Sequence, residues 1–397
     1  MTSISPGPPP RRGGGIPPTV WALGFVSLLM DVSSEIVHAL LPVFLTAGLG
    51  ASVAMVGLID GIAEATANIS KLFSGYLSDR VGRRKPLILL GYGLAAATKP
   101  LFALANGAGT VLGARFADRI GKGIRGAPRD ALIADVTPPM MRGRAFGLRQ
   151  ALDTAGAFIG PLLAILLMLA FANDMRAVFW VAAVPALLSV LVVLFRVKDP
   201  PADPARRSAP PFRLGELKAL PGAFWGVLAI GMVFTLARFS EAFLILKANE
   251  QGLPLALTPL VLVAMNLVYS AGAYPAGIAS DFVSPKKLLL LGLAALIAAD
   301  LLLALDGGLM AVFAGILLWG VHMALTQGLL SKLVADHSPE RLRGSAFGLF
   351  NLGSGLALLA ASVIAGLLWD QIGPHATFLA GAAFASTAFA AIALKLR

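Results

Sequence analysis

The sequence predicts an all-α polytopic membrane protein, in which twelve transmembrane helices form two parallel six-helix pseudo-repeats. Three observations support this prediction. Hydrophobic residues make up 57% of the 397 residues and charged residues only 13%, whereas a typical soluble domain contains about 25% charged residues. Apolar segments recur along the whole chain at a length of roughly 20 residues, which a helix needs to cross a bilayer. The two halves also share a sequence motif. This composition excludes a soluble enzyme and a disordered chain.

The elements follow in order along the chain. Residues 1–18 are rich in Pro and Gly and lack the apolar core of a signal peptide, so we predict a disordered cytoplasmic tail. An N-terminal half over residues 19–196 and a C-terminal half over residues 222–397 follow, joined by a Pro-rich cytoplasmic linker over residues 197–221. Twelve apolar segments are predicted to span the membrane, near residues 20–47, 53–78, 86–106, 109–134, 144–171, 176–196, 222–247, 255–280, 287–305, 308–334, 344–369 and 375–395.

Basic residues mark one side of the predicted membrane. Besides Arg11 and Arg12 of the tail, Arg176, and Lys247 at a helix end, Lys and Arg outside the apolar segments gather at residues 80–85, 142–144, 196–218, 286–287, 341–343 and 395–397. Because short loops rich in Lys and Arg stay in the cytoplasm, we predict that both termini are cytoplasmic and that the protein lies in the cell inner (cytoplasmic) membrane. The net charge of +11 then reflects topology, and we predict no nucleic-acid partner.

An internal repeat relates the two halves. Residues 132–148 read LIADVTPPMMRGRAFGL and residues 333–349 read LVADHSPERLRGSAFGL, with identical residues at ten of seventeen positions. The offset of 201 residues is about half the chain and corresponds to six spans, so both copies keep the same orientation in the membrane. Two parallel six-helix halves, related by an axis along the membrane normal, are an established plan of secondary transporters.

Three further motifs connect the chain to a known family. Residues 75–85 read GYLSDRVGRRK, residues 119–126 read RIGKGIRG, and residues 156–161 read GAFIGP. These sequences resemble the loop signature between the second and third spans, the fourth-span motif and the fifth-span motif of the major facilitator superfamily. The resemblance covers all twelve spans. It implies a secondary transporter that works by alternating access, with a central cavity lined by the first, fourth, seventh and tenth spans.

The resemblance also implies roles for individual residues. Gly156, Gly160 and Pro161 form the motif that the family associates with antiporters, and they allow their helix to pack closely and to bend. Arg119 is the expected link between protonation and substrate. The loop signature is expected to act as a conformational latch that stabilises the outward-facing state, and its residues are Gly75, Asp79, Arg80, Gly82, Arg83 and Arg84. The alternative is that this charged loop only sets the topology.

Ionisable residues inside the predicted spans point to a cavity. Asp31, Glu35 and His38 fall within an arc of about 60° on one helix, and Asp60 and Glu64 share a face of the next. Each charge costs about 2.5–3.5 kcal/mol at the bilayer centre, so each should face a partner or a wet cavity. The predicted proton-coupling and substrate residues are Asp31, Glu35, His38, Asp60, Glu64, Arg119, Arg149, Asp153, Arg238 and Glu241.

Alternatives to a proton-coupling role remain open for these residues. The acids of the first two spans could instead form structural ion pairs with Arg115, Arg119, Arg125 or Arg149, and Arg238 could pair with Glu241 three residues along the same helix. For the opposite cavity wall, the candidate polar side chains are those of Asn266, Tyr269, His322, Gln327 and Asn351.

Cofactor chemistry has little basis in the sequence. The chain has no Cys, and only Asp31, Glu35 and His38 suggest a divalent metal site, so no firm metal site is predicted. No phosphate-binding or dinucleotide motif is present, so we predict no cofactor, no use of ATP and a proton gradient as the energy source. The predicted partners are the lipid bilayer and a small-molecule or ion substrate, and the chain is predicted to be a monomer.

The predicted function follows from these points. We predict that the protein is not an enzyme but a secondary active transporter, which exports a small solute in exchange for protons. A cationic drug-like compound and a metal or metal chelate are the predicted solutes. A proton- or cation-coupled uptake symporter is one alternative. A non-transporting membrane receptor or assembly factor is another, although such a protein has no need for several buried charges.

Overall fold

The structure is a computed structural model that describes residues 15–81, 83–199, 220–339 and 342–395. For some residues of the helices only the backbone is described, namely 72, 75, 76, 79–81, 280, 281, 328, 331, 332, 335, 343–345 and 395. Most of the predicted tail and linker therefore lies outside the described residues, and so does Gly82 of the predicted latch. The described residues contain helices and no β-strand, as the composition predicts.

The first half of the chain forms six long helices. Their limits are close to the predicted spans, and Pro or Gly residues stand in most of the connections between them. The helices are α1 (Pro18–Val43), which continues into the π-helical turn η1 (Phe44–Gly48), α2 (Val53–Val81), α3 (Lys85–Ala103), α4 (Ala108–Val136), α5 (Arg142–Ala170, preceded by the 3₁₀ turn η2, Pro139–Met141) and α6 (Met175–Arg196).

The second half differs from the prediction in its first span. The helices are α7 (Gly222–Leu236), α8 (Ala242–Glu250), α9 (Leu260–Phe282, preceded by the 3₁₀ turn η5, Leu255–Leu257), α10 (Pro285–Ala304), α11 (Gly308–Asp336), α12 (Arg343–Gln371) and α13 (Pro374–Lys395). The single helix predicted over residues 222–247 is wrong, because the chain unwinds at residues 237–241 between α7 and α8.

Side chains support this interruption of the helix. The backbone N–H of Ser240 donates to Ser362 Oγ on α12 at 3.2 Å, and the N–H of Ala242 donates to Ser240 Oγ at 3.1 Å. Irregular backbone at membrane depth is tolerated where it is buried in protein or lines a cavity. Arg238 and Glu241 therefore do not share a face of one helix as predicted, since they lie within the unwound segment.

Hydropathy identifies most of the spans. Among the described residues, ten helical segments are long and apolar enough to cross a membrane. Two predicted spans fail this test. The α4 helix is 29 residues long, but it carries a series of charged residues from Arg115 to Asp130. The α7 helix has only 15 residues before the unwound segment, which α8 then follows.

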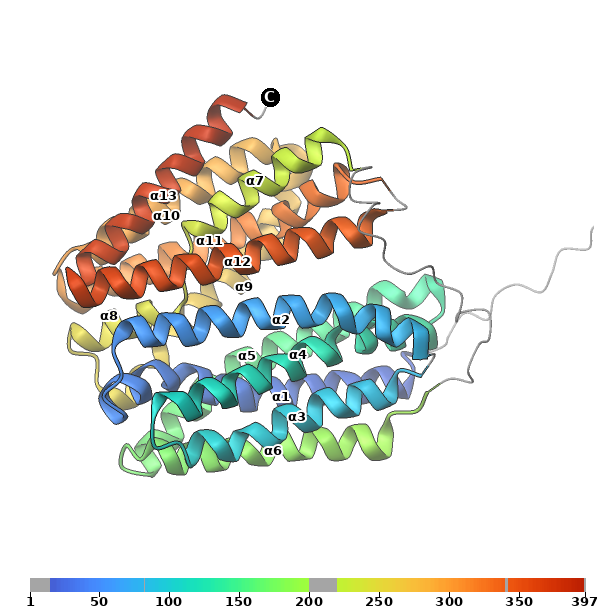
Figure 1. The fold of residues 1–397 in the computed structure, drawn as a ribbon. Helices are drawn as coiled ribbons and strands as arrows, with labels where there is room; N and C mark the ends of the chain where they lie inside the picture. Colours follow the sequence, from blue (N-terminus) through green and yellow to red (C-terminus); the bar gives the residue numbers. More distant parts are fainter. Residues whose placement is uncertain (1–14, 82, 200–219, 340–341, 396–397) are drawn as a thin grey trace, which may run out of the picture.

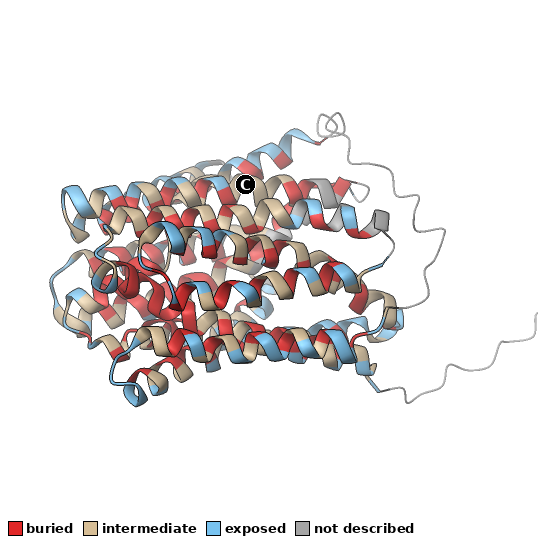
Figure 2. Ribbon diagram, turned by 60° about the horizontal axis from the view of Figure 1, so that its bottom comes forward, coloured by how far each residue is buried: buried red, intermediate tan, exposed pale blue. Residues whose placement is uncertain are grey.

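The surface agrees with a multi-pass membrane protein. Figure 2 shows buried residues inside the bundle and exposed ones on its outward faces. Large apolar side chains are exposed there, including those of Leu166, Leu187 and Phe195, of which 60%, 57% and 71% is accessible. So many exposed apolar side chains on long apolar helices are expected of a lipid-facing surface.

Packing repeats between the halves. In the first half, α1 packs against α5 and α6, α4 packs against α2 and α3, and α3 packs against α6. In the second half, α7 packs against α12 and α13, α11 packs against α9 and α10, and α10 packs against α13. Helices at corresponding places in the two halves therefore have corresponding neighbours.

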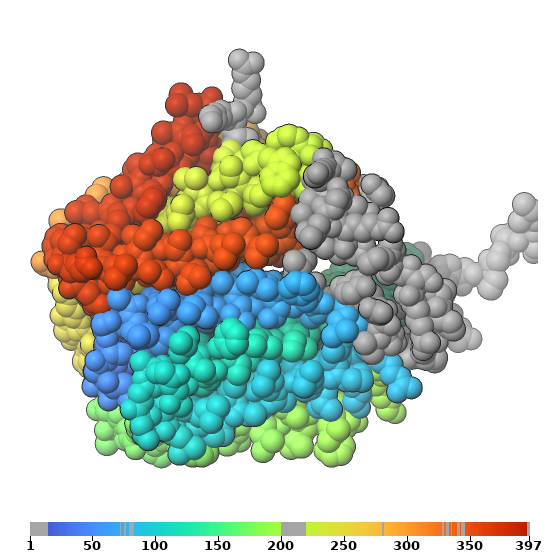
Figure 3. Space-filling view, viewed as in Figure 1, coloured from blue at the N-terminus to red at the C-terminus, as the bar shows by residue number. Residues whose placement is uncertain are grey.

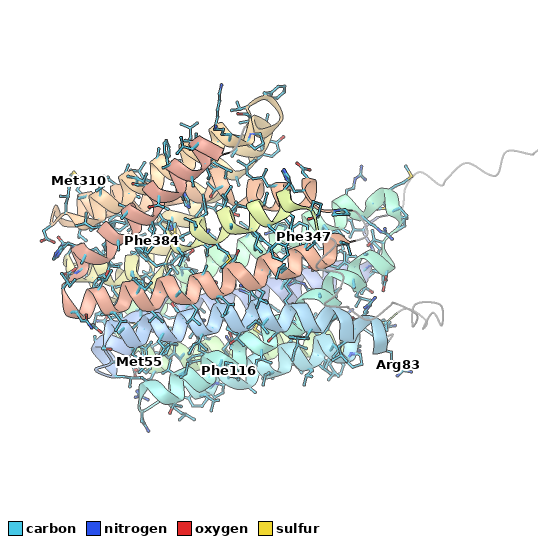
Figure 4. All side chains as sticks on the ribbon, turned by 45° about the horizontal axis from the view of Figure 1, so that its top comes forward. Met55, Arg83, Phe116, Met310, Phe347 and Phe384 are labelled. Carbon is cyan, nitrogen blue, oxygen red and sulfur yellow. The ribbon has the colours of Figure 1, made fainter. Side chains whose placement is uncertain are left out.

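The two halves meet along α2 with α12 and along α5 with α9. Figures 1 and 3 show α2 and α12 running side by side across the molecule. We call the end where α2 finishes and α3 begins the basic end, and Arg83 marks it in Figure 4. Met55 and Met310 mark the opposite end. Figure 1 shows α2 and α12 diverging toward the basic end.

The opposite end is closed by contacts between the halves. There α8 packs against α1 and α2, and η5 packs against α5. Glycines let the backbones approach, because a Cβ at Gly366 of α12 would lie 2.6 Å from Ala54 Cα, and one at Gly61 of α2 would lie 2.9 Å from Leu359 Cα. The carboxylate of Asp370 in α12 accepts hydrogen bonds from the N–H groups of Val53 and Ala54, at 3.0 and 2.8 Å.

A smaller contact within the second half also lies at this end. Lys247 of α8 is 1% exposed, and its Nζ lies 3.0 Å from Asp306 Oδ1 and 3.4 Å from Glu250 Oε2. Asp306 stands in the exposed connection between α10 and α11. The hydrogen bond from Lys247 and its positive charge lower the pKa of the Asp306 carboxyl. The exposed carboxylate thereby satisfies a buried ammonium group.

Candidate functional site

Two adjoining cavities lie between the halves of the molecule. The larger has a volume of about 420 Å³ and is lined from α1, α2, α4, α5 and α9. The smaller, of about 250 Å³, is lined from the same helices, from the unwound segment before α8 and from α12. Both cavities are lined by Glu35, Lys122, Ala157 and Asn266, so they meet at these residues.

Two of the predicted acids line the cavities without a partner. Asp31 and Glu35 are half-buried on α1, one turn apart. Both line the larger cavity, and Glu35 lines the smaller one as well. Among the described residues, neither carboxylate has a cationic nitrogen within 4.0 Å or a hydrogen bond. The structural ion pairs considered from the sequence therefore do not form at these two acids.

The fifth-span motif packs directly behind these acids. A Cβ at Gly156 would lie 2.9 Å from Asp31 Cβ, and one at Gly160 would lie 2.6 Å from Glu35 Cβ. Both distances are shorter than ordinary contacts between carbon atoms, so only glycine fits without movement of α1. Pro161 is buried beside them in α5. The motif thus brings α5 against the stretch of α1 that carries the two acids.

The acids of α2 form ion pairs with α4. Glu64 Oε1 lies 3.3 Å from Arg119 Nη2, and Asp60 Oδ1 lies 3.4 Å from Arg115 Nη2. For these two acids the structure shows the ion pairs that the sequence left as the alternative. The pairs cross from one helix to its neighbour, so both acids remain in the cavity wall.

Asp60 also connects the two halves. Its Oδ2 accepts a hydrogen bond of 2.7 Å from Ser240 Oγ in the unwound segment. On the other side, Arg115 Nη2 lies 2.8 Å from His38 Nδ1. A chain of polar contacts therefore leads from α1 through α4 and α2 to the second half.

His38 and Asp31, on the same helix, line different cavities. His38 lines the smaller cavity, whereas Asp31 lines only the larger one. Among the described residues, no group of three or more His, Asp or Glu side chains has the geometry to hold a metal ion. The structure does not bring Asp31, Glu35 and His38 together as a metal site.

The charged pair predicted on the seventh span is also rearranged. Arg238 and Glu241 both line the smaller cavity, but within the described part of the chain neither has an ion-pair partner within 4.0 Å. The intrahelical ion pair is therefore wrong, because the backbone that would have aligned the two side chains is unwound.

A second network of charges lies in the larger cavity. Arg149 of α5 contacts Asp153 Oδ2 at 2.9 Å and Asp130 Oδ1 at 3.2 Å. Arg129 contacts the same oxygen of Asp130 at 3.2 Å and donates to Ser27 Oγ at 2.7 Å. The predicted residues Arg149 and Asp153 are thus paired with each other.

Some of the polar residues predicted for the cavity wall of the second half do line a cavity. Asn266 and Tyr269 of α9 line the larger cavity, and the Tyr269 hydroxyl donates to Gln327 Oε1 at 2.9 Å. His322 is fully buried inside the second half, where its Nδ1 lies 2.9 Å from the carbonyl oxygen of Gly292. Asn351 does not line either cavity.

The latch is described only in part. The side chains of Asp79 and Arg80 lie outside the described residues, as do Gly75 beyond its backbone and all of Gly82. Arg83 is exposed. Arg84 Nε lies 3.5 Å from Asp135 Oδ2 at the end of α4. A latch between the two halves at the basic end stays a prediction.

The predicted site residues do not include three charged residues, of which Lys99 and Asp300 are buried and Lys122 is exposed in the cavity wall. Lys99 of α3 is 1% exposed and contacts Asp118 Oδ1 at 3.0 Å and Ser34 Oγ at 3.1 Å. Lys122 lines both cavities without an ion-pair partner among the described residues. Asp300 of α10 is fully buried, and neither carboxylate oxygen has a hydrogen-bond partner among the described residues. Lys99 and Asp300 are each the single charge well inside an apolar segment, which is the signal that would have found them.

Comparisons with known proteins agree with this architecture. A family model described as Major Facilitator Superfamily matches residues 23–264 and 227–397. An uncharacterized MFS-type transporter of Methanocaldococcus jannaschii is 36% identical over 376 residues, which is 92% of each chain. The multidrug resistance protein MdtH of Salmonella typhi is 25% identical over 357 residues, which is 87% of this chain and 85% of that protein.

A solved structure shares the fold. A POT family transporter, crystallised in complex with a thioalcohol-conjugated peptide, superposes with a TM-score of 0.79 at 14% identity, over 95% of each chain. At that identity the likeness concerns the fold alone. It supports the predicted all-α fold of twelve spans. The predicted cavity lining is found only in part, because no described residue of α11, the predicted tenth span, lines either cavity. Together with the family match and the relatives, the shared fold shows that the chain belongs to the Major Facilitator Superfamily of membrane transporters.

Proposed function

We propose that the protein exports a small solute across the cytoplasmic membrane in exchange for protons, by alternating access between its two halves. The observation that carries this proposal is the position of Asp31 and Glu35. Both are half-buried carboxylates in the wall of the central cavity, and neither has a cationic partner among the described residues. Carboxylates held this way can gain and lose protons during a transport cycle.

The two acids supply a coupling mechanism. A negative carboxylate attracts a cationic group of the substrate, and protonation removes that attraction. Substrate and proton then compete for the same oxygen atoms, so binding of one favours release of the other. Arg119, paired with Glu64 in the same wall, is placed to respond to such a change of charge.

Alternating access is supported by the contacts between the halves. The halves touch at the opposite end, through α8 and through the Asp370 contact with α2. The larger cavity is lined by Arg129 of α4 and Arg149 of α5, which lie toward the basic end of their helices. We assign the basic end to the cytoplasm because Lys and Arg remain on that side of short loops. The described conformation is then the inward-facing one.

Export is supported by two observations. Residues 156–161 resemble the antiporter motif, and they pack against the proposed proton carriers. One relative is named a multidrug resistance protein. A cationic drug-like compound and a metal or metal chelate are the solutes expected from the sequence. An uptake symporter with the same carriers would differ in the direction of coupled flux.

Proton movement in proteoliposomes tests the proposal. Vesicles with an internal pH dye are challenged in turn with tetraphenylphosphonium, Mn²⁺ and the zwitterion 6-aminohexanoate. We expect at least one class to drive proton movement, and the Asp31→Asn, Glu35→Gln double variant to abolish it. Asp336→Asn, which changes an exposed carboxylate at the end of α11, is the matched control. A double variant that folds and transports with unchanged rate and pH dependence would contradict the proposal.

A further inference from the structure

The charged residues of the two cavities fall into two groups. Four acids are neutralised by arginines within 3.4 Å, through contacts of α2 with α4 and within the α4–α5 network. These paired acids are Asp60, Glu64, Asp130 and Asp153. The opposite charges in such pairs offset each other and leave little net charge for a ligand.

The second group has no partner of opposite charge. Among the described residues, none of its members has an ion pair within 4.0 Å, although all of them line a cavity. The acids of this group are Asp31, Glu35 and Glu241, and the bases are Lys71, Lys122, Arg125 and Arg238. Each cavity is lined by unpaired groups of both signs.

Arg125 gives a separate indication of an anionic ligand. Its side chain is 5% exposed, and its guanidinium lies 4.6 Å above the ring of Tyr92. Its Nη1 is buried and has no hydrogen-bond partner in the described part of the chain. A buried cationic donor that lacks an acceptor is costly, and a carboxylate or phosphate in the cavity would remove that cost.

A solute of a single charge fits this wall poorly. A cation would satisfy the free acids but would meet the like charges of Lys122, Arg125 and Arg238. An anion would meet the corresponding repulsion from the acids. A lipophilic cation would also need apolar and aromatic walls. Among the described residues that line the cavities, only Phe158, Phe239 and Leu358 have large side chains without a polar group.

We infer that the cavity binds a small hydrophilic solute that carries both an anionic and a cationic group. Lys122 and Arg125 hold the anionic group, while Glu35, Asp31 and Glu241 surround the cationic group. The residues come from both halves, so a molecule with both charges can satisfy them together. This inference rests on the proposed function, since it names the substrate class of the same site.

Equilibrium binding to the purified full-length protein in detergent tests the substrate class. The probes are two zwitterions, 6-aminohexanoate and 4-(aminomethyl)benzoate, each with its carboxamide, which is only cationic, and its N-acetyl form, which is only anionic. We expect each zwitterion to bind at least tenfold more tightly than its two derivatives. Equal binding of a derivative, tighter binding of tetraphenylphosphonium, or no binding of either zwitterion would overturn the inference.

Two variants separate the poles of the site. Arg125→Gln should weaken binding of the zwitterions and of the N-acetyl forms but leave the carboxamides unaffected. Glu241→Gln should weaken binding of the zwitterions and of the carboxamides but leave the N-acetyl forms unaffected. Arg144→Gln, at an exposed position at the start of α5, is the control for loss of a positive charge. If both variants fold and weaken all probes equally, the assignment of separate poles is wrong.

Failure of the inference and failure of the proposed function are distinguishable. The binding experiment needs no proton gradient. The flux experiment also uses tetraphenylphosphonium and Mn²⁺, so its result does not depend on a zwitterion alone. Proton movement driven by tetraphenylphosphonium, with no zwitterion bound, overturns the inference and leaves proton-coupled transport intact. Zwitterion binding without any coupled flux leaves the inference intact and overturns the coupling.

Discussion

The charged residues of this protein differ in how well a partner of opposite charge neutralises them. Asp60 and its partner Arg115 have side chains that are 6% and 2% exposed, whereas Glu64 is 37% exposed beside Arg119 at 7%. Removal of one partner from a buried pair costs about 3–5 kcal/mol, because the other charge stays buried and uncompensated. Water reaches Glu64 in its pair with Arg119, so breaking that pair should cost less than breaking the pair of Asp60 and Arg115.

We therefore expect Asp60→Asn to lower the thermal unfolding midpoint in detergent more than Glu64→Gln does. Asp60→Asn also weakens the contact with Ser240 across the halves. The two variants make the same chemical change on the same helix, so each is the control for the other. An equal effect would show that solvent reaches Asp60 and Arg115 as readily as Glu64.

Asp300 is a buried acid with no compensation among the described residues. Both of its carboxylate oxygens lack hydrogen-bond partners. Its replacement by a similar apolar side chain removes the cost of burying an unsatisfied polar group, which is about 1–3 kcal/mol. We expect Asp300→Leu to raise the unfolding midpoint. Asp118→Leu is the matched contrast, because Asp118 pairs with the buried Lys99, and its loss should lower the midpoint. A lower midpoint for Asp300→Leu would reveal a polar partner of this acid.

At the scale of elements, the contact between α1 and α5 determines where the acids stand. Gly160 allows α5 to approach Glu35, whose Cβ would lie 2.6 Å from an added Cβ. Gly160→Ala should therefore displace α1 and reduce proton-coupled transport at least tenfold. Gly147→Ala changes the same helix at a position where an added Cβ meets no atom within 4 Å. The Gly147→Ala variant should transport normally. An equal loss of transport in both variants would point to changed helix propensity and not to the contact between α1 and α5.

The unwound segment between α7 and α8 shows the limit of hydropathy at this scale. Residues 222–247 read as one apolar run, and the pattern along the run contains no Pro that would end a helix. In the structure, Ser362 of α12 supports the interruption by accepting a hydrogen bond from the backbone of Ser240. A partner 122 residues away in the chain leaves no local signal.

At the scale of the molecule, Asp370 joins the halves at the opposite end. It contacts the free N–H groups at the start of α2, where the helix dipole also favours a negative charge. This contact forms only while that end is closed. Asp370→Asn should therefore increase opening there, by roughly tenfold for each 1.4 kcal/mol lost.

A single thiol can report this opening, because the natural chain contains no Cys. With Leu358→Cys in the smaller cavity, an impermeant maleimide added at the opposite end should react faster when Asp370 is replaced. Asp174→Asn is the control, since Asp174 caps α6 within its own half. Unchanged labelling in the Asp370 variant would show that other contacts keep this end closed.

The topology of the whole chain has a direct test as well. Met310 is exposed at the opposite end and Arg83 at the basic end. In intact cells, an impermeant maleimide should label Met310→Cys, but should label Arg83→Cys only after permeabilisation. The reverse pattern would place the basic end outside and would invert the proposed direction of transport.

Much of this protein is determined by its sequence alone. Hydropathy identifies a multi-pass membrane protein, the repeat of residues 132–148 at 333–349 indicates two halves, and helical periodicity places Asp31 and Glu35 on an inward face. These signals are local, because they depend on residues within one or two helices. The membrane strengthens them, since it penalises any exposed charge or unpaired backbone group.

Only the tertiary structure decides how the charges are compensated. The sequence offers Arg115, Arg119, Arg125 and Arg149 equally to the acids, yet Asp60 and Glu64 take two of them while Asp31 and Glu35 take none. The choice depends on how neighbouring helices are placed, and glycines such as Gly156 and Gly160 set that placement through contacts between distant parts of the chain. Charge balance is a property of positions in space, and spacing along one helix does not contain it.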